Sequence, residues 1–98
     1  MLKLDEIRAD LKDIRYYYNR CRNLHDGFPI TGHHKIVGIA KRYHEAMLSA
    51  PIRLYDVYVS LYILNYTQEG LAIELNYTPE YVQMQHKKLL LFLQEELS

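Results

Sequence analysis

Residues 67–93 read TQEGLAIELNYTPEYVQMQHKKLLLFL, and this stretch decides the fold that we expect. It predicts two helices joined by a tight turn, with the small residue Ala72 where the helices must cross closely. Asn76 follows four residues later and tolerates the left-handed conformation that ends a helix. Thr78 and Pro79 then supply an N-cap oxygen and a ring suited to the first helical position. The pattern is typical of a helix-turn-helix unit.

The same segment resembles the helix-turn-helix of bacterial sigma-factor region 4, in which a Thr-Gln-Glu start, an Ile/Leu-Ala step, a turn, a Ser/Thr-Pro-Glu cap and a Val follow in order. The residues that match this order are Thr67, Gln68, Glu69, Leu71, Ala72, Leu75, Thr78, Pro79, Glu80 and Val82. The preceding PIRLYDVYVSLYIL, residues 51–64, is similar to the helix that backs the motif in that family. The whole chain is more loosely similar to phage-encoded regulators of the ArpU and RinA type. The resemblance implies a small phage or prophage transcription regulator that binds DNA.

The sequence departs from the region 4 pattern on the second helix of the unit. Exposed positions that carry Arg or Lys in that family are Pro79, Tyr81 and Gln83 here, and one turn beyond Val82, where an aliphatic residue is common, both Gln85 and His86 are polar. His86 is then either a hydrogen-bonded residue at the edge of the core or a sign that the helix is rotated from the family's placement.

Size and composition predict one soluble globular domain over residues 1–98, with N-terminal helices and a loop in residues 1–50 and the region 4-like unit in residues 51–98. The chain has 98 residues, of which 49% are hydrophobic and 24% charged. No apolar run approaches the roughly 20 residues that cross a bilayer, and acidic residues occupy the start where a signal peptide would not have them. The single cysteine, Cys21, fits a reducing compartment. We therefore expect a cytoplasmic protein without a membrane partner.

Helical spacing of apolar residues predicts an all-α fold of about five helices in one bundle. The first helix should run from about Leu2 to Arg22, the second from about His34 to Ser49, and the third from Pro51 to about Leu64, with the last two in the stretch quoted above. The stripes expected to face the core are Leu4, Ile7, Leu11, Ile14, Tyr18 and Cys21; Ile36, Ala40, Tyr43 and Met47; and Val82, His86, Leu89, Leu93 and Leu97. The third helix should be the central one, through Ile52, Tyr55, Tyr58, Val59, Tyr62 and Ile63.

The second helix of the unit would enter the major groove with its exposed N-terminal part. Gln83 suits a bidentate contact with adenine, Glu80 can accept a hydrogen bond from cytosine, and Met84 can touch a thymine methyl group. Tyr81 and Lys87 are placed to flank phosphates, and Thr67 and Thr78 are further expected backbone contacts. A solvated helix face is the alternative explanation.

Charge is unevenly divided along a chain of zero net charge. Residues 1–66 hold ten Lys and Arg against seven Asp and Glu, a balance of +3, whereas residues 67–98 hold two against five, a balance of −3. Phosphate contacts supply most of the affinity of DNA-binding proteins, so the basic N-terminal segment is a candidate source, with Arg20, Arg22 and Lys35 as the expected contacts. Its other members are Arg15, Lys41, Arg42, His25, His33, His34 and His44. A scattered solvated face explains these residues equally well.

No catalytic or metal-binding pattern emerges from the sequence. There is no Gly-rich phosphate loop and no nucleophile in a recognisable turn, so we expect neither an enzyme nor a cofactor. Cys21, His25, His33 and His34 are residue types that zinc accepts, but they lack the paired ligands at short intervals that structural zinc sites show. No metal is therefore expected.

Two functions remain open from the sequence. The first is a regulator that reads double-stranded DNA, and extra apolar residues near the C-terminus, Leu90, Leu91 and Phe92, favour a homodimer. The alternative is a protein-interaction module that binds RNA polymerase or another regulator without reading bases, which the acidic C-terminal third favours.

Overall fold

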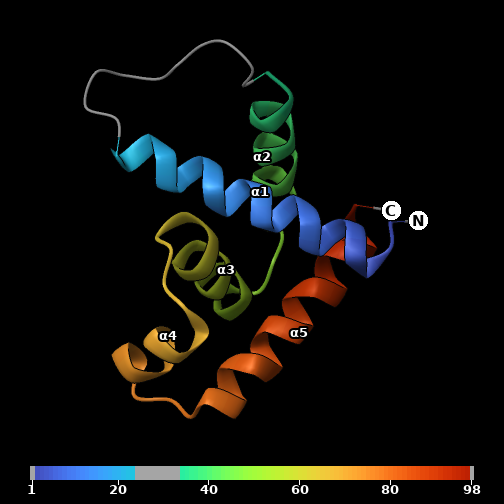
Figure 1. Ribbon diagram of the computed structural model, residues 1–98. Helices are drawn as coiled ribbons and strands as arrows, with labels where there is room; N and C mark the ends of the chain where they lie inside the picture. The colour runs from blue at the N-terminus through green and yellow to red at the C-terminus, as the bar shows by residue number, and fades with distance from the viewer. Residues whose placement is uncertain (1, 24–33, 98) are drawn as a thin grey trace.

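The computed structural model describes residues 2–23 and 34–97, and these residues form an all-α bundle, as the sequence predicts. Figure 1 shows α1 crossing the middle of the molecule, with α2 on one side of it and α4 and the start of α5 on the other. The helices are α1 (Leu4–Asn23), α2 (His34–Met47), α3 (Ile52–Tyr58), which continues into a π-helical turn η1 (Val59–Ile63), α4 (Gln68–Leu75) and α5 (Pro79–Glu96).

The first helix, α1, has the core stripe that its sequence spacing predicts. Ile7, Leu11 and Ile14 are fully buried, and they recur at spacings of three and four residues, which place them on one helical face. Asp5 and Glu6 lie in the first turn, where carboxylates interact favourably with the positive end of the helix dipole. The side chain of Cys21, the last residue of the expected stripe, lies outside the described residues.

The second helix, α2, is fixed to α1 by a buried polar contact as well as by its apolar stripe. Tyr43 is fully buried with Ala40 and Met47, and its hydroxyl donates a hydrogen bond to Asp10 Oδ2 at 2.7 Å. Burial, followed by the contact with Asp10, raises the pKa of the Tyr43 phenol well above its usual value. The helix ends at Met47, two residues before the predicted Ser49.

The third helix turns most of its predicted stripe to the core, since Tyr58 is buried and Tyr55, Val59, Tyr62 and Ile63 pack against the buried cluster, but Ile52 is an exception. Ile52 is 76% exposed, and the buried residues are Leu54, Val57, Tyr58 and Leu61. This segment carries apolar residues over a broad arc of the helix. Pro51 begins the helix at the surface, and η1, in which the Leu64 amide donates to the Val59 carbonyl at 2.8 Å, changes the helical phase at its end.

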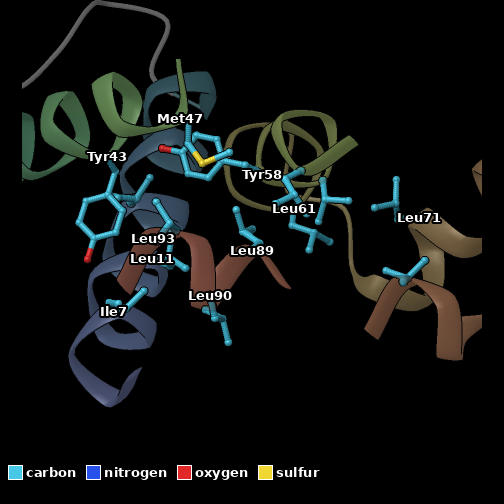
Figure 2. Close-up of a cluster of buried hydrophobic side chains, with 14 of the residues drawn as sticks. Ile7, Leu11, Tyr43, Met47, Tyr58, Leu61, Leu71, Leu89, Leu90 and Leu93 are labelled. Carbon is cyan, nitrogen blue, oxygen red and sulfur yellow. The ribbon is translucent and has the colours of Figure 1, made fainter. Parts of the chain in front are cut away.

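The third helix, which we predicted to be central, packs together with η1 against α1, α4 and α5, and the more central element is α5. This last helix contacts α1, α2, α3 and α4. Its predicted residues Val82, Leu89 and Leu93 are buried, and so are Gln85 and Leu90, which we had not placed in the core. Figure 2 shows Leu89 and Leu93 among side chains from the other helices, and Leu90 belongs to the same buried cluster. Because Leu90 packs internally, it is not part of the surplus apolar surface from which a homodimer was predicted.

The buried side chains of all these helices form one hydrophobic cluster. The two ends of the described chain are also joined, since the Gln94 side-chain amide donates to the Leu2 carbonyl at 3.0 Å. In the part of the chain that the structure describes, no helix combines the length and the apolar character needed to cross a bilayer.

Candidate nucleic-acid interface

The turn between α4 and α5 is built by local hydrogen bonds. Asn76 adopts the left-handed conformation, with φ 61° and ψ 34°. Its amide donates to the Ile73 carbonyl at 3.3 Å, and the Tyr77 amide donates to the Ala72 carbonyl at 2.9 Å. These two bonds are the Schellman pattern, which satisfies carbonyls at the end of a helix. The direction in which the chain leaves α4 is thereby fixed.

Both helices of this unit begin at a threonine N-cap. The Thr67 hydroxyl accepts a hydrogen bond from the Gly70 amide at 2.9 Å, and the Thr78 hydroxyl accepts one from the Tyr81 amide at 3.2 Å. Pro79 occupies the first turn of α5, where its missing N–H costs nothing. The caps that the sequence predicted are therefore present, and they set where α5 starts.

The two helices pack against each other through small and aliphatic side chains. Ala72 is 2% exposed, as are Leu71 on the same helix and Val82 on α5. A small residue at the contact lets two helix backbones approach closely. This contact leaves the opposite face of α5 free of α4.

The three residues predicted to touch bases lie together in solvent. Glu80 and Gln83 are exposed, and Met84 is 46% exposed. They lie within the first two turns of α5, opposite the side that carries buried Val82 and Leu89. We call Glu80, Gln83 and Met84 the α5 ridge. The ridge combines a carboxylate that accepts hydrogen bonds, an amide that both donates and accepts, and an apolar side chain. These are the kinds of group that contact base edges in the major groove.

A groove lies on each side of the α5 ridge. The first, which we call the α1–α5 groove, lies between α1, the start of α4 and α5, and its polar lining residues are Arg8, Gln68, Gln83, His86 and Lys87. The second lies between α3, the turn and α5, and its lining includes Arg53, Asp56, Tyr77, Tyr81 and Gln85. Each groove therefore places an arginine from another helix beside the start of α5.

Tyr81 and Lys87, predicted as phosphate contacts, line these two grooves. The Tyr81 hydroxyl accepts a hydrogen bond from Arg53 Nη1 at 2.8 Å, and its ring centroid is 4.6 Å from that of Tyr77. Lys87 is exposed in the α1–α5 groove. Thr67 and Thr78 are also exposed, and their hydroxyls serve as N-caps, as described above.

The structure does not gather the predicted basic residues of the N-terminal segment beside the ridge. Arg20 donates to the Tyr16 hydroxyl at 3.0 Å, and Arg15 donates to the Asn65 carbonyl at 3.3 Å. Lys35 belongs to the first turn of α2, and Figure 1 shows α2 on the other side of α1 from α4. The side chains of Arg22 and His34, together with His25 and His33, lie outside the described residues. Phosphate contact by Arg20, Arg22 and Lys35 stays a prediction.

His86 is a hydrogen-bonded residue at the edge of the core, the first of the two alternatives drawn from the sequence. Its Nε2 lies 2.5 Å from the Tyr62 hydroxyl, and the two rings are tilted at 31°. Burial of the imidazole and then the nearby Arg8 guanidinium lower the pKa of His86 below its ordinary 6.5. Burial raises the pKa of Tyr62 to about 12. The ring is therefore neutral in the folded protein at neutral pH.

We expect the free energy of unfolding to decrease as the pH falls below about 6.5, because unfolded His86 takes up a proton at its ordinary pKa while the folded ring resists protonation. The stabilisation that the neutral His86 ring contributes is fully present above that pH, and it is lost as the pH falls toward the lower pKa of His86 in the folded protein. Urea unfolding at pH 7.5, 6.5 and 5.5 measures the decrease. His86→Gln should decrease less over this window, whereas His44→Gln, at an exposed position on α2, should follow the wild type. An equal decrease in all three proteins would contradict the assignment.

Sequence reasoning missed Arg8, Arg53 and Gln85 as neighbours of the α5 start. Arg8 and Arg53 belong to α1 and α3, so only the packing of those helices against α5 places them there. Gln85 is buried beside α3, and its polar type gave no reason to expect burial. Among the described residues, no three His, Cys, Asp or Glu side chains gather as a metal site.

Comparisons of the chain with family models, curated proteins and solved structures find no match. What this surface binds is therefore inferred from the chemistry of its own side chains.

Proposed function

We propose that this protein is a sequence-specific DNA-binding transcription regulator that reads the major groove with the start of α5. The observation that supports it is the solvent exposure of Glu80, Gln83 and Met84 directly after a capped helix start. A helix can enter the major groove only where its face is uncovered. The turn at Asn76 and the contact at Ala72 leave this face open.

Each residue of the α5 ridge has a distinct role in the proposal. The Gln83 side-chain amide can make a bidentate contact with adenine, in which its NH2 group donates to N7 and its carbonyl oxygen accepts from the N6 amino group. The Glu80 carboxylate can accept a hydrogen bond from the cytosine amino group. In this position the carboxylate points toward the base edges and away from the phosphates. The Met84 side chain offers apolar contact to a thymine methyl group.

Charges from other helices support DNA binding by a unit that is itself acidic. Within residues 67–98 the formal balance is −3, which would repel a phosphate backbone. Arg8 and Arg53 lie in the two grooves beside the α5 ridge. The cations beside the proposed reading helix thus come from α1 and α3 as well as from Lys87 of α5 itself, and the charge of residues 67–98 alone underestimates the local positive charge.

Selection of bound duplexes from a random-sequence DNA library, followed by gel shifts at several salt concentrations, tests the proposal. We expect one sequence to be enriched, and Gln83→Ala to weaken its binding by about tenfold while leaving binding to mixed-sequence DNA unchanged, because the lost contact reads a base. Asn19→Ala, which removes an exposed amide from α1, should retain wild-type binding to both DNAs.

Failure to enrich any sequence, or binding that disappears at moderate salt for every duplex, would contradict the proposal. That outcome would favour the second candidate, a module that binds RNA polymerase or another regulator. Its specific support is on α4, where Ile73 is 81% exposed between the acidic residues Glu69 and Glu74. A protein partner with a basic rim and an apolar pocket would fit that surface, whereas DNA would not.

A further inference from the structure

The α1–α5 groove is a hollow of about 460 Å³ beside the α5 ridge, with both polar and apolar lining residues. Two cations, Arg8 and Lys87, and two amides, Gln68 and Gln83, contribute its polar lining, together with His86. Leu4, Leu90 and Leu91 complete it, and the described residues that line it include no carboxylate. An anion is therefore the ligand class that its chemistry favours.

Arg8 is available to a ligand in this groove. Its side chain is 58% exposed, and its ion pair with Asp5, at 3.5 Å, joins it to a carboxylate that is 95% exposed. Exposed pairs of this kind contribute little free energy, so an anion in the groove can replace Asp5 at small cost. A guanidinium is also suited to phosphate because its planar donors match two phosphate oxygens at once.

The position of the groove indicates which anion it holds. Gln83 belongs both to the groove lining and to the α5 ridge, so an anion bound here lies directly beside the residue proposed to read a base. When a helix enters the major groove, the phosphates of the adjoining strand border that helix on either side. Gln68, at the start of α4, lines the same groove from the other helix of the unit.

We propose that the α1–α5 groove binds a phosphate group of the DNA backbone, with Arg8 and Lys87 neutralising its charge and the Gln68 amide donating a hydrogen bond. This inference rests on the proposed DNA-binding function and deepens it. Arg8 lies on α1 and Lys87 on α5, so one phosphate would connect the first and the last helix to the duplex. The contact positions α5 on the DNA without reading its sequence.

Gel shifts of Arg8→Gln and Lys87→Gln over a range of salt concentrations test the groove. Each variant should weaken binding by roughly three- to tenfold for the selected site and for mixed-sequence DNA alike, and should reduce the slope of log K against log salt by about 0.9. Lys12→Gln loses the same charge at an exposed position of α1 that is not among the lining residues given for the groove, and should keep the wild-type slope. Circular dichroism and thermal unfolding of each variant verify that the fold is retained.

The results separate this inference from the proposed function. Site-specific wild-type binding with an unchanged salt slope in Arg8→Gln and Lys87→Gln would overturn the phosphate site and leave the proposed function standing. Absence of any site-specific binding by the wild type would overturn both. Stabilisation of the wild type by inorganic phosphate, lost in Arg8→Gln but without any effect on the DNA salt slope, would assign the groove to a small phosphate compound and overturn the backbone contact.

Discussion

Replacing Leu89 with Ala is expected to lower the free energy of unfolding by about 2–5 kcal/mol, the range for a buried leucine truncated to alanine. Leu89 is fully buried, and Figure 2 places it in the middle of the labelled core side chains. The helix that carries it contacts every other α-helix. The cavity would therefore open where several helices meet, and its walls could not collapse by moving one helix alone.

Urea unfolding monitored by circular dichroism measures this decrease, and Leu91→Ala is the matched control. Leu91 lies two residues away on α5 but is 47% exposed, so its truncation should change the free energy of unfolding by far less. A domain of this kind has about 5–15 kcal/mol of stability in total, which makes the Leu89 effect a large share. Equal effects of the two substitutions would show that α5 is not packed as described.

Features that depend on neighbouring residues in the sequence were predictable. The buried stripe Ile7, Leu11 and Ile14 follows from helical spacing alone. The turn follows from the conformational tolerance of Asn76 and the capping chemistry of Thr78. Each of these features is determined by residues within a few turns of helix, so it could be predicted without knowledge of the tertiary packing.

Features that depend on how helices pack were not predictable in the same way. The third helix has apolar residues over a broad arc, and the sequence offered no means to predict that Leu54 and Leu61 would be buried while Ile52 would be exposed. Leu90 is buried because α1 covers its side of α5. That coverage is a contact between the two ends of the chain, and local spacing carries no information about it.

The same distinction between local features and features that depend on helix packing applies to the candidate site. Exposure of the α5 ridge was predicted because it follows from the stripe on the opposite face of one helix. The cations beside it, Arg8 and Arg53, were not, since they lie far from α5 in the sequence. The charge balance of whole segments does not indicate which individual side chains lie beside α5.

Ala72→Leu is expected to lower the free energy of unfolding by about 1–3 kcal/mol, because the larger side chain does not fit where α4 and α5 cross. Ala72 is 2% exposed there, and its carbonyl accepts the hydrogen bond from Tyr77 that shapes the turn. Leucine favours a helix nearly as well as alanine, so the loss would come from crowding between helices. Thermal and urea unfolding measure it.

Ala9→Leu makes the same change at an exposed position of α1 and should alter stability by no more than about 0.5 kcal/mol. The pair also tests whether the α4–α5 crossing matters for the proposed function. Relief of the crowding would move α4, and Gln68 with it, away from the groove beside the α5 ridge, so Ala72→Leu should weaken DNA binding at temperatures where it is still folded. Undiminished binding by a folded Ala72→Leu protein would show that α5 reads DNA without the position of α4 being fixed.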